Sequence, residues 1–187
     1  MLLRRVGDAG TRPVSLDQGK AYLRVTNSAE DTLIAALIAA ACDLVGEMSG
    51  RVLASETWAW SQPSFSGTET LPKSPVLALT SVAYVNSAGA AITATLGNFV
   101  LYLNDDLAQI SPINGADWPD GDTSRPDGVT VTFTAGYTAL PDSLRMAVLL
   151  LLGHYYTNRE AVGAGMEELP LSIHHLTSAY RIGWAAA

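Results

Sequence analysis

Cysteine and histidine are scarce in this sequence, and their scarcity excludes several kinds of site. The single cysteine, Cys42, cannot form an intramolecular disulfide, and one cysteine with three histidines cannot supply a structural zinc site. Charged residues are also scarce, at 16% of the chain where about 25% is usual. The mean hydropathy is +0.19. We interpret this combination as surface that other copies of the protein cover, and we expect neither a metal nor a cofactor.

The sequence predicts no membrane contact. Its most apolar stretch, residues 146–153, is bounded by Arg145 and His154 and is shorter than the roughly 20 apolar residues that a spanning helix needs. The first residues lack the apolar core and the cleavage site of a secretory signal peptide. We therefore expect the protein in the cytoplasm or in an assembled particle.

Negative charge dominates, but it is unevenly distributed. The net charge is −7. Residues 1–24 contain five basic and two acidic residues, a net charge of +3, whereas the remainder contains six basic and sixteen acidic residues, a net charge of −10. An acidic body disfavours tight binding of nucleic acid, which depends on Lys and Arg. The basic N-terminal arm, residues 1–14, is the one candidate contact for an anionic partner, and the alternative is a solvated tail.

Two helical regions flank the middle of the chain. Ser15 and Gln18 form a capping box, which predicts a helix ending near Arg24. Apolar residues at helical spacing follow the cap signals at residues 27–31 and predict a second helix that Gly50 ends. These helices occupy residues 15–50, and further helices are predicted over residues 141–184, opening at Pro141.

The middle region, residues 55–135, predicts short strands. Residues 129–134 alternate apolar side chains with threonine, as in a strand with one buried face. Trp58 and Trp60 are expected on one face of another strand. The fold class is therefore α+β: N-terminal and C-terminal helices pack as a small bundle, with a small, mostly antiparallel sheet inserted between them. We treat residues 1–187 as a single domain.

The long loop at residues 112–128 is rich in aspartate but does not match a calcium site. Its acidic residues, among them Asp117, Asp120 and Asp122, miss the spacing of an EF-hand. We expect an exposed acidic loop that binds no structural metal.

The residue types that carry catalysis are not arranged for it. Cys42 lies within an apolar helix, where a thiol behaves as a small hydrophobic group. His174 and His175 are adjacent and therefore point about 100° apart on a helix, so that they cannot chelate one ion. His154 ends an apolar helix, where it can bond to a backbone carbonyl. We do not expect an enzyme.

The order of the motifs resembles the head–tail connector proteins of long-tailed bacteriophages and gene transfer agents, also called adaptor or head-completion proteins. The resemblance covers the chain from Ser15 to about Trp184. It lies in residues 15–25 with the acidic helix start at Glu30 and Asp31, in residues 71–76, 82–85 and 131–137, in the helix that Pro141 opens, and in residues 155–160. It implies a structural virion protein at the head–tail interface, assembled in the host cytoplasm. Such proteins form a ring, here expected to be twelvefold, between the portal protein and a tail-completion or stopper protein. The ring extends the DNA channel without sequence-specific binding and provides the platform for tail attachment.

We expect the subunit or portal interface near the end of the apolar helix that Pro141 opens. Arg159 would make a forked contact with an acid of a neighbouring subunit while stacking on a tyrosine ring. The interface residues in this hypothesis are Tyr155, Tyr156, Asn158, Arg159, Glu160, Leu176 and Tyr180. Two alternatives stay open: a monomeric binding module for nucleic acid or peptide, and a small enzyme.

Overall fold

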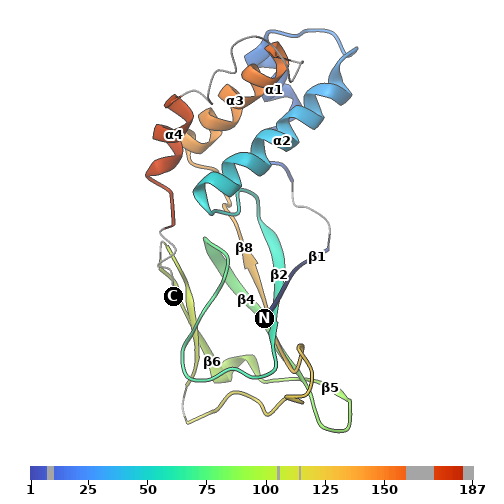
Figure 1. Ribbon diagram of the computed structural model, residues 1–187, viewed down its shortest axis with the longest axis vertical. Helices are drawn as coiled ribbons and strands as arrows, with labels where there is room; N and C mark the ends of the chain where they lie inside the picture. The colour runs from blue at the N-terminus through green and yellow to red at the C-terminus, as the bar shows by residue number, and fades with distance from the viewer. Residues whose placement is uncertain (8–10, 105, 114, 159–170, 183–187) are drawn as a thin grey trace. The chain divides into compact units, whose positions relative to one another are not determined.

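The computed structural model describes the chain except residues 8–10, 105, 114, 159–170 and 183–187 (Figure 1). The chain divides into two units, each assembled from segments far apart in the sequence. The first combines Met1–Gly10 with Ala54–Tyr137 and contains the strands, and the second combines Thr11–Leu53 with Thr138–Ala187 and contains the α-helices. The α+β fold class predicted from the sequence is confirmed.

The first unit contains a five-stranded antiparallel sheet in the order β1-β2-β8-β4-β5 (Figure 1). Its strands are β1 (Leu2–Val6), β2 (Glu56–Gln62), β8 (Val129–Ala135), β4 (Val76–Val85) and β5 (Ala91–Thr93). The burial of β8 alternates along its length, with Val131 and Phe133 fully buried and the threonines between them half-buried. The predicted strand at residues 129–134 is therefore confirmed.

A second, three-stranded antiparallel sheet has the order β3-β7-β6. It consists of β3 (Glu69–Thr70), β7 (Gln109–Pro112) and β6 (Phe99–Tyr102), and the short 3-10 helix η1 (Leu96–Asn98) precedes β6.

An aromatic cluster forms part of the core of this unit. The ring of Phe65 lies 4.7 Å from that of Trp60 and 4.9 Å from that of Trp118, and Trp118 lies 5.1 Å from Phe99, measured between centroids. The indole of Trp118 donates a hydrogen bond to the Gly67 carbonyl, which attaches the acidic loop to the segment before β3.

Strand β1 lies within the segment that the sequence indicated only as a basic arm. Leu2–Val6 pairs with β2 along its whole length, and Arg5 forms an ion pair with Glu56 at 3.4 Å. The apolar residues of this segment suit an edge strand, where exposed arginines face solvent without cost. The sequence did not predict this strand, because its arginines are typical of a charged tail and its partner β2 lies more than fifty positions away.

The described residues of the second unit form a bundle of four helices: α1 (Leu16–Leu23), α2 (Asp31–Ser49), α3 (Asp142–Thr157) and α4 (Leu171–Ser178). The capping box of Ser15 and Gln18 is present, and Gly50 ends α2 with a φ of 70°. The cap of α2 differs from the prediction: Glu30 occupies the N-cap, but its side chain makes no capping hydrogen bond to the helix backbone, and Asn27 accepts a bond from the Ala29 amide instead.

Helix α2 packs against the other three helices of the unit. Its buried residues include Ile34, Ile38 and Val45. By length and composition alone, α2 would also pass for a membrane-spanning helix, since its mean hydropathy is 1.6. The contacts with α1, α3 and α4 account for part of that composition, since 33% of the apolar stretch is buried inside the protein. Gly19 allows the close approach of α1, since a Cβ there would lie 2.7 Å from Cδ1 of Ile38.

Candidate functional site

The two tyrosines of the predicted interface lie on the last turns of α3 and are half-buried. The hydroxyl of Tyr156 donates a hydrogen bond to a carboxylate oxygen of Glu30, the N-cap residue of α2. Burial raises the pKa of the Tyr155 phenol. Tyr156 therefore has a role within the bundle, as well as any role toward a partner.

Asn158 closes helix α3. Its backbone amide and its side-chain amide both donate to the carbonyl of His154, at 2.9 and 3.1 Å. The side chain remains exposed. The two charged residues that follow, Arg159 and Glu160, lie outside the described residues.

The other two predicted interface residues belong to the C-terminal part of the bundle. Leu176 on α4 and Tyr180 just after it are both half-buried. The carbonyl of Tyr180 accepts a hydrogen bond of 2.8 Å from Nε of Arg51, and the Ile182 amide donates to the Ser49 carbonyl at 3.2 Å. The end of the described chain is thus attached to the C-terminus of α2.

Sequence reasoning missed Arg51, a charged residue that is buried, with 8% exposure. Arg51 follows Gly50, which ends a helix, and precedes the apolar pair Val52 and Leu53. An isolated cation between a helix end and apolar residues was the signal that could have pointed to it. Sequence reasoning also missed the partly buried ion pair of Lys20 with Asp31, whose charged atoms lie 2.6 Å apart and which links α1 to α2.

Helix α3 buries one side and leaves apolar groups on another. Leu144, Leu151 and Leu152 are fully buried, whereas Met146 is 45% exposed. Leu149 and Leu150 are half-buried. The helix is therefore not enclosed by the bundle of a single copy, and its outer side offers apolar surface.

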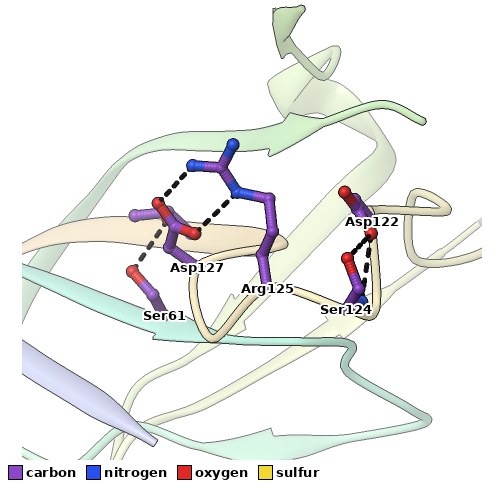
Figure 2. Close-up of polar contacts among 6 residues, drawn as sticks. Ser61, Asp122, Ser124, Arg125 and Asp127 are labelled. Carbon is purple, nitrogen blue, oxygen red and sulfur yellow. Dashed lines mark hydrogen bonds and ion pairs between the residues drawn. The ribbon is translucent and has the colours of Figure 1, made fainter. Parts of the chain in front are cut away.

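The acidic loop between β7 and β8 is held in place by local contacts (Figure 2). Asp122 accepts hydrogen bonds from the amide and hydroxyl of Ser124, and Arg125 forms a forked ion pair with Asp127 at 3.0 and 3.1 Å. These bonds lower the pKa values of Asp122 and Asp127, Ser124 being the main cause for Asp122 and Arg125 for Asp127.

Backbone contacts fix the same loop to the sheet. The Asp122 amide donates to the Val85 carbonyl at 2.7 Å, and the Val85 amide donates to the Gly128 carbonyl at 2.9 Å. A Cβ on Gly121 would lie 2.4 Å from the Gly128 carbonyl oxygen, so this close approach requires glycine. The loop is shaped by these backbone contacts and by the burial of Trp118, with Asp117 and Asp120 exposed.

Replacing Asp117, Asp120 and Asp122 together by asparagine is expected to change the free energy of unfolding by no more than about 1 kcal/mol, as is usual for surface substitutions. Asparagine at position 122 can still accept a bond from Ser124. Thermal unfolding of the wild type and the triple variant, each with and without calcium, measures this. A large calcium-dependent rise in the melting temperature of the wild type would contradict it.

The described residues do not form a catalytic or metal-binding cluster. Among them, no three His, Cys, Asp or Glu side chains are grouped to hold one metal ion. Burial raises the pKa of the Cys42 thiol to about 11, so it stays protonated near neutral pH, and the thiolate is the reactive form. His174 and His175 are both exposed on α4.

Comparison with known proteins identifies the family. The chain matches the head completion protein family over residues 14–167, and it therefore belongs to that family. A search among curated proteins found no match.

Solved structures of gene transfer agent particles contain chains of the same fold. One, from the neck of an empty particle computed with sixfold symmetry, has 25% identity and a TM-score of 0.79, and covers 97% of this chain and 95% of that chain. Another, from the neck of a native particle computed with twelvefold symmetry, has 24% identity and a TM-score of 0.77 over the same shares. A third, from the virion of a native particle, has 22% identity and a TM-score of 0.76, again over 97% and 95%.

These findings confirm the resemblance deduced from the sequence motifs. The protein is a structural component of the particle at the head–tail junction, with the role of a head–tail connector, and its family is not a family of enzymes.

Proposed function

We propose that this protein forms a ring between portal and tail, extends the DNA channel and provides the platform for tail attachment. The observation that carries the proposal is the likeness over 97% of the chain to a chain of a gene transfer agent neck, at 25% identity and a TM-score of 0.79. Necks computed with sixfold and twelvefold symmetry support a twelvefold ring of this chain. Its partners are the portal protein on one side and a tail-completion or stopper protein on the other.

The physical properties of the chain support an assembly that DNA passes through. Outside residues 1–24 the net charge is −10, and an acidic wall repels phosphate, so that DNA moves past without being held. The partly exposed apolar side of α3 supports contacts between copies, because exposed apolar surface is covered in an assembly.

The interface that we propose keeps the residues expected from the sequence: Tyr155, Tyr156, Asn158, Arg159, Glu160, Leu176 and Tyr180. The exposure of Asn158 and the partial exposure of Leu176 and Tyr180 support contact with a partner. The hydrogen bond from Tyr156 to Glu30 gives that tyrosine a fixed position from which to pack against a neighbour.

Cryo-microscopy of purified particles tests the proposal. We expect density for twelve copies between portal and tail. If the protein occurs only as a free monomer in the host and is absent from particles, the proposal is wrong, and a monomeric binding module becomes the better interpretation.

Replacing Arg159 by alanine or lysine is expected to leave the protein folded but to impair its incorporation into particles. An Arg that closely follows two tyrosines in the sequence can make a forked contact to a carboxylate of a neighbouring copy, a geometry that Lys does not reproduce. Circular dichroism of the purified variants and counts of tailed and tailless particles measure this.

The matched control is Arg181→Ala, which removes an exposed arginine of the same unit. We expect normal tail attachment in that variant. Normal attachment in Arg159→Ala as well would leave residue 159 as an ordinary solvated position.

A further inference from the structure

The five-stranded sheet has two unpaired edges that match each other. On one side, the outer edge of β1 (Leu2–Val6) is unpaired by any other described strand. On the other side, β5 covers only the end of β4, pairing with Ala83–Val85, while the Ala94 amide donates to the Val82 carbonyl. The first part of β4, residues 76–81, therefore has no strand of the described chain on its outer side.

We propose that β1 of one copy pairs with this free part of β4 of the next copy, so that the sheet continues from subunit to subunit around the ring. The inference rests on the proposed function, because a ring supplies the neighbouring copy. It adds to that function the pairing element and the partner, which is a second copy of this chain.

The strand directions favour this pairing. β1 is antiparallel to β2, and β2 and β4 are each antiparallel to β8, so β1 and β8 run one way and β2 and β4 the other. Repeating the sheet sideways without reversing it brings β1 of one copy antiparallel to β4 of the next. The new junction is thus of the same kind as every junction within the sheet. It is also heterologous, which is the type of contact that closes into a ring.

Length and side chains also match. The five residues of β1 fit beside the six free residues of β4. The ladder registers place Leu2 of β1 and Ala78 of β4 on the same face of the sheet, and both are exposed, Leu2 at 46%. No residue of β4 is charged, so nothing on that strand opposes pairing through charge.

Charge favours a second copy as the occupant. The N-terminal 24 residues have a net charge of +3 and include the exposed Arg4 and Arg5 of β1, whereas the rest of the chain has a net charge of −10. Adding β1 to a neighbour therefore brings a basic segment onto an acidic body. Opposite charges steer such an encounter, and like ends of two copies repel each other.

The same edges contain features that keep the pairing weak in free protein. The arginines of β1 and the two register shifts of β4, at Leu77 and Thr80, are of the kinds that limit indiscriminate edge pairing. A junction of five residues per strand is far smaller than a stable interface, which buries about 1,200 Å² or more. We therefore expect the pairing to form where the portal holds copies side by side and raises their effective concentration.

Cysteine cross-linking in assembled particles tests the proposal. Arg4→Cys is combined with Ala78→Cys in one variant and with Ser81→Cys in another, since the ladder registers place these three side chains on one face of the sheet. Within one copy, three strand spacings of about 4.8 Å separate β1 from β4, and a disulfide needs Cα atoms within about 7 Å. A disulfide in these variants therefore reports two different copies. The native Cys42 stays in place because it is buried.

After mild oxidation, we expect the neck protein in at least one of the two variants to shift from the monomer band to a ladder of covalent multimers that a reductant collapses. The control pair is Arg4→Cys with Ser87→Cys, which places the second cysteine in the exposed turn beyond β4, and we expect it to remain monomeric. Particles that contain both test variants only as monomers would overturn the edge pairing while leaving the ring intact. Absence of the unmodified protein from particles would instead overturn the proposed function.

Cryo-microscopy of the unmodified particle gives an answer even if the cysteine variants fail to assemble. Strand density that runs without a gap from β1 of one copy to β4 of the next supports the proposal. Density in which other chains or solvent separate β1 of one copy from β4 of the next would overturn it.

Discussion

Replacing Gly136 by alanine is expected to lower the free energy of unfolding by about 3 kcal/mol or more, which places it among the large single-residue effects. Gly136 has a φ of +123°, a conformation that L-residues rarely adopt, and a Cβ there would lie 2.0 Å from the Ala54 carbonyl oxygen. The atom in the way is backbone, so it cannot swing aside as a side chain would. The Gly136 amide also donates to the Pro75 carbonyl at 2.7 Å, which holds the residue in place.

Urea unfolding followed by tryptophan fluorescence measures this effect, since Trp58, Trp60 and Trp118 all lie in the same unit as Gly136. The matched control is Gly97→Ala in η1, where a Cβ would have nothing within 4 Å. We expect that variant to change the free energy of unfolding by less than about 1 kcal/mol, in either direction. Equal stabilities for the two variants would show that the chain relaxes around residue 136 and would refute the steric argument.

Elements with a strong local signal could be predicted from the sequence. The capping box at Ser15 starts α1, Gly50 ends α2, and the alternation at residues 129–134 becomes β8, because in each case the deciding residues lie within one short segment. β1 could not be predicted in this way. Its segment contains two adjacent arginines, and it becomes a strand only by pairing with β2, which is distant in the sequence.

The candidate site was only partly accessible from the sequence, for a similar reason. What the sequence shows of the predicted interface is the place of residues 155–160 at the end of an apolar helix and of Leu176 and Tyr180 on one face of the last predicted helix. The hydrogen bond between Tyr156 and Glu30 joins residues 126 positions apart, and the one between Arg51 and Tyr180 joins residues 129 positions apart. Neither bond therefore produces a local pattern in the sequence. What the sequence shows of Arg51 is only an isolated charge in an apolar setting, and the structure is needed to find its partner.

Replacing Arg51 by alanine is expected to lower the free energy of unfolding by about 2–3 kcal/mol, the range for losing a hydrogen bond from a charged group together with buried side-chain contacts. Arg51 is 8% exposed, and its Nε donates to the Tyr180 carbonyl at 2.8 Å. Without it, that carbonyl loses a donor and the stem of the side chain leaves a gap beside the end of α2. Urea unfolding measures the loss of stability, and hydrogen exchange locates it. In Arg51→Ala, the exchange rate of the Ile182 amide, which donates to Ser49, should rise more above its wild-type value than the rates of amides in the middle of α2.

Two variants separate this attachment from a general effect of charge. Arg51→Lys keeps the positive charge but not the position of Nε, so we expect it to recover only part of the lost stability. Arg181→Ala removes an exposed arginine next to Tyr180 in the sequence. We expect it to change the free energy of unfolding by no more than about 0.5 kcal/mol. If Arg51→Ala left both the stability and the exchange of Ile182 unchanged, α4 would be held by its apolar residues alone. If instead the exchange of the Ile182 amide rose in Arg51→Ala and did not change in Arg181→Ala, Arg51 would be the residue that holds the segment from Tyr180 to Ile182 at the C-terminus of α2.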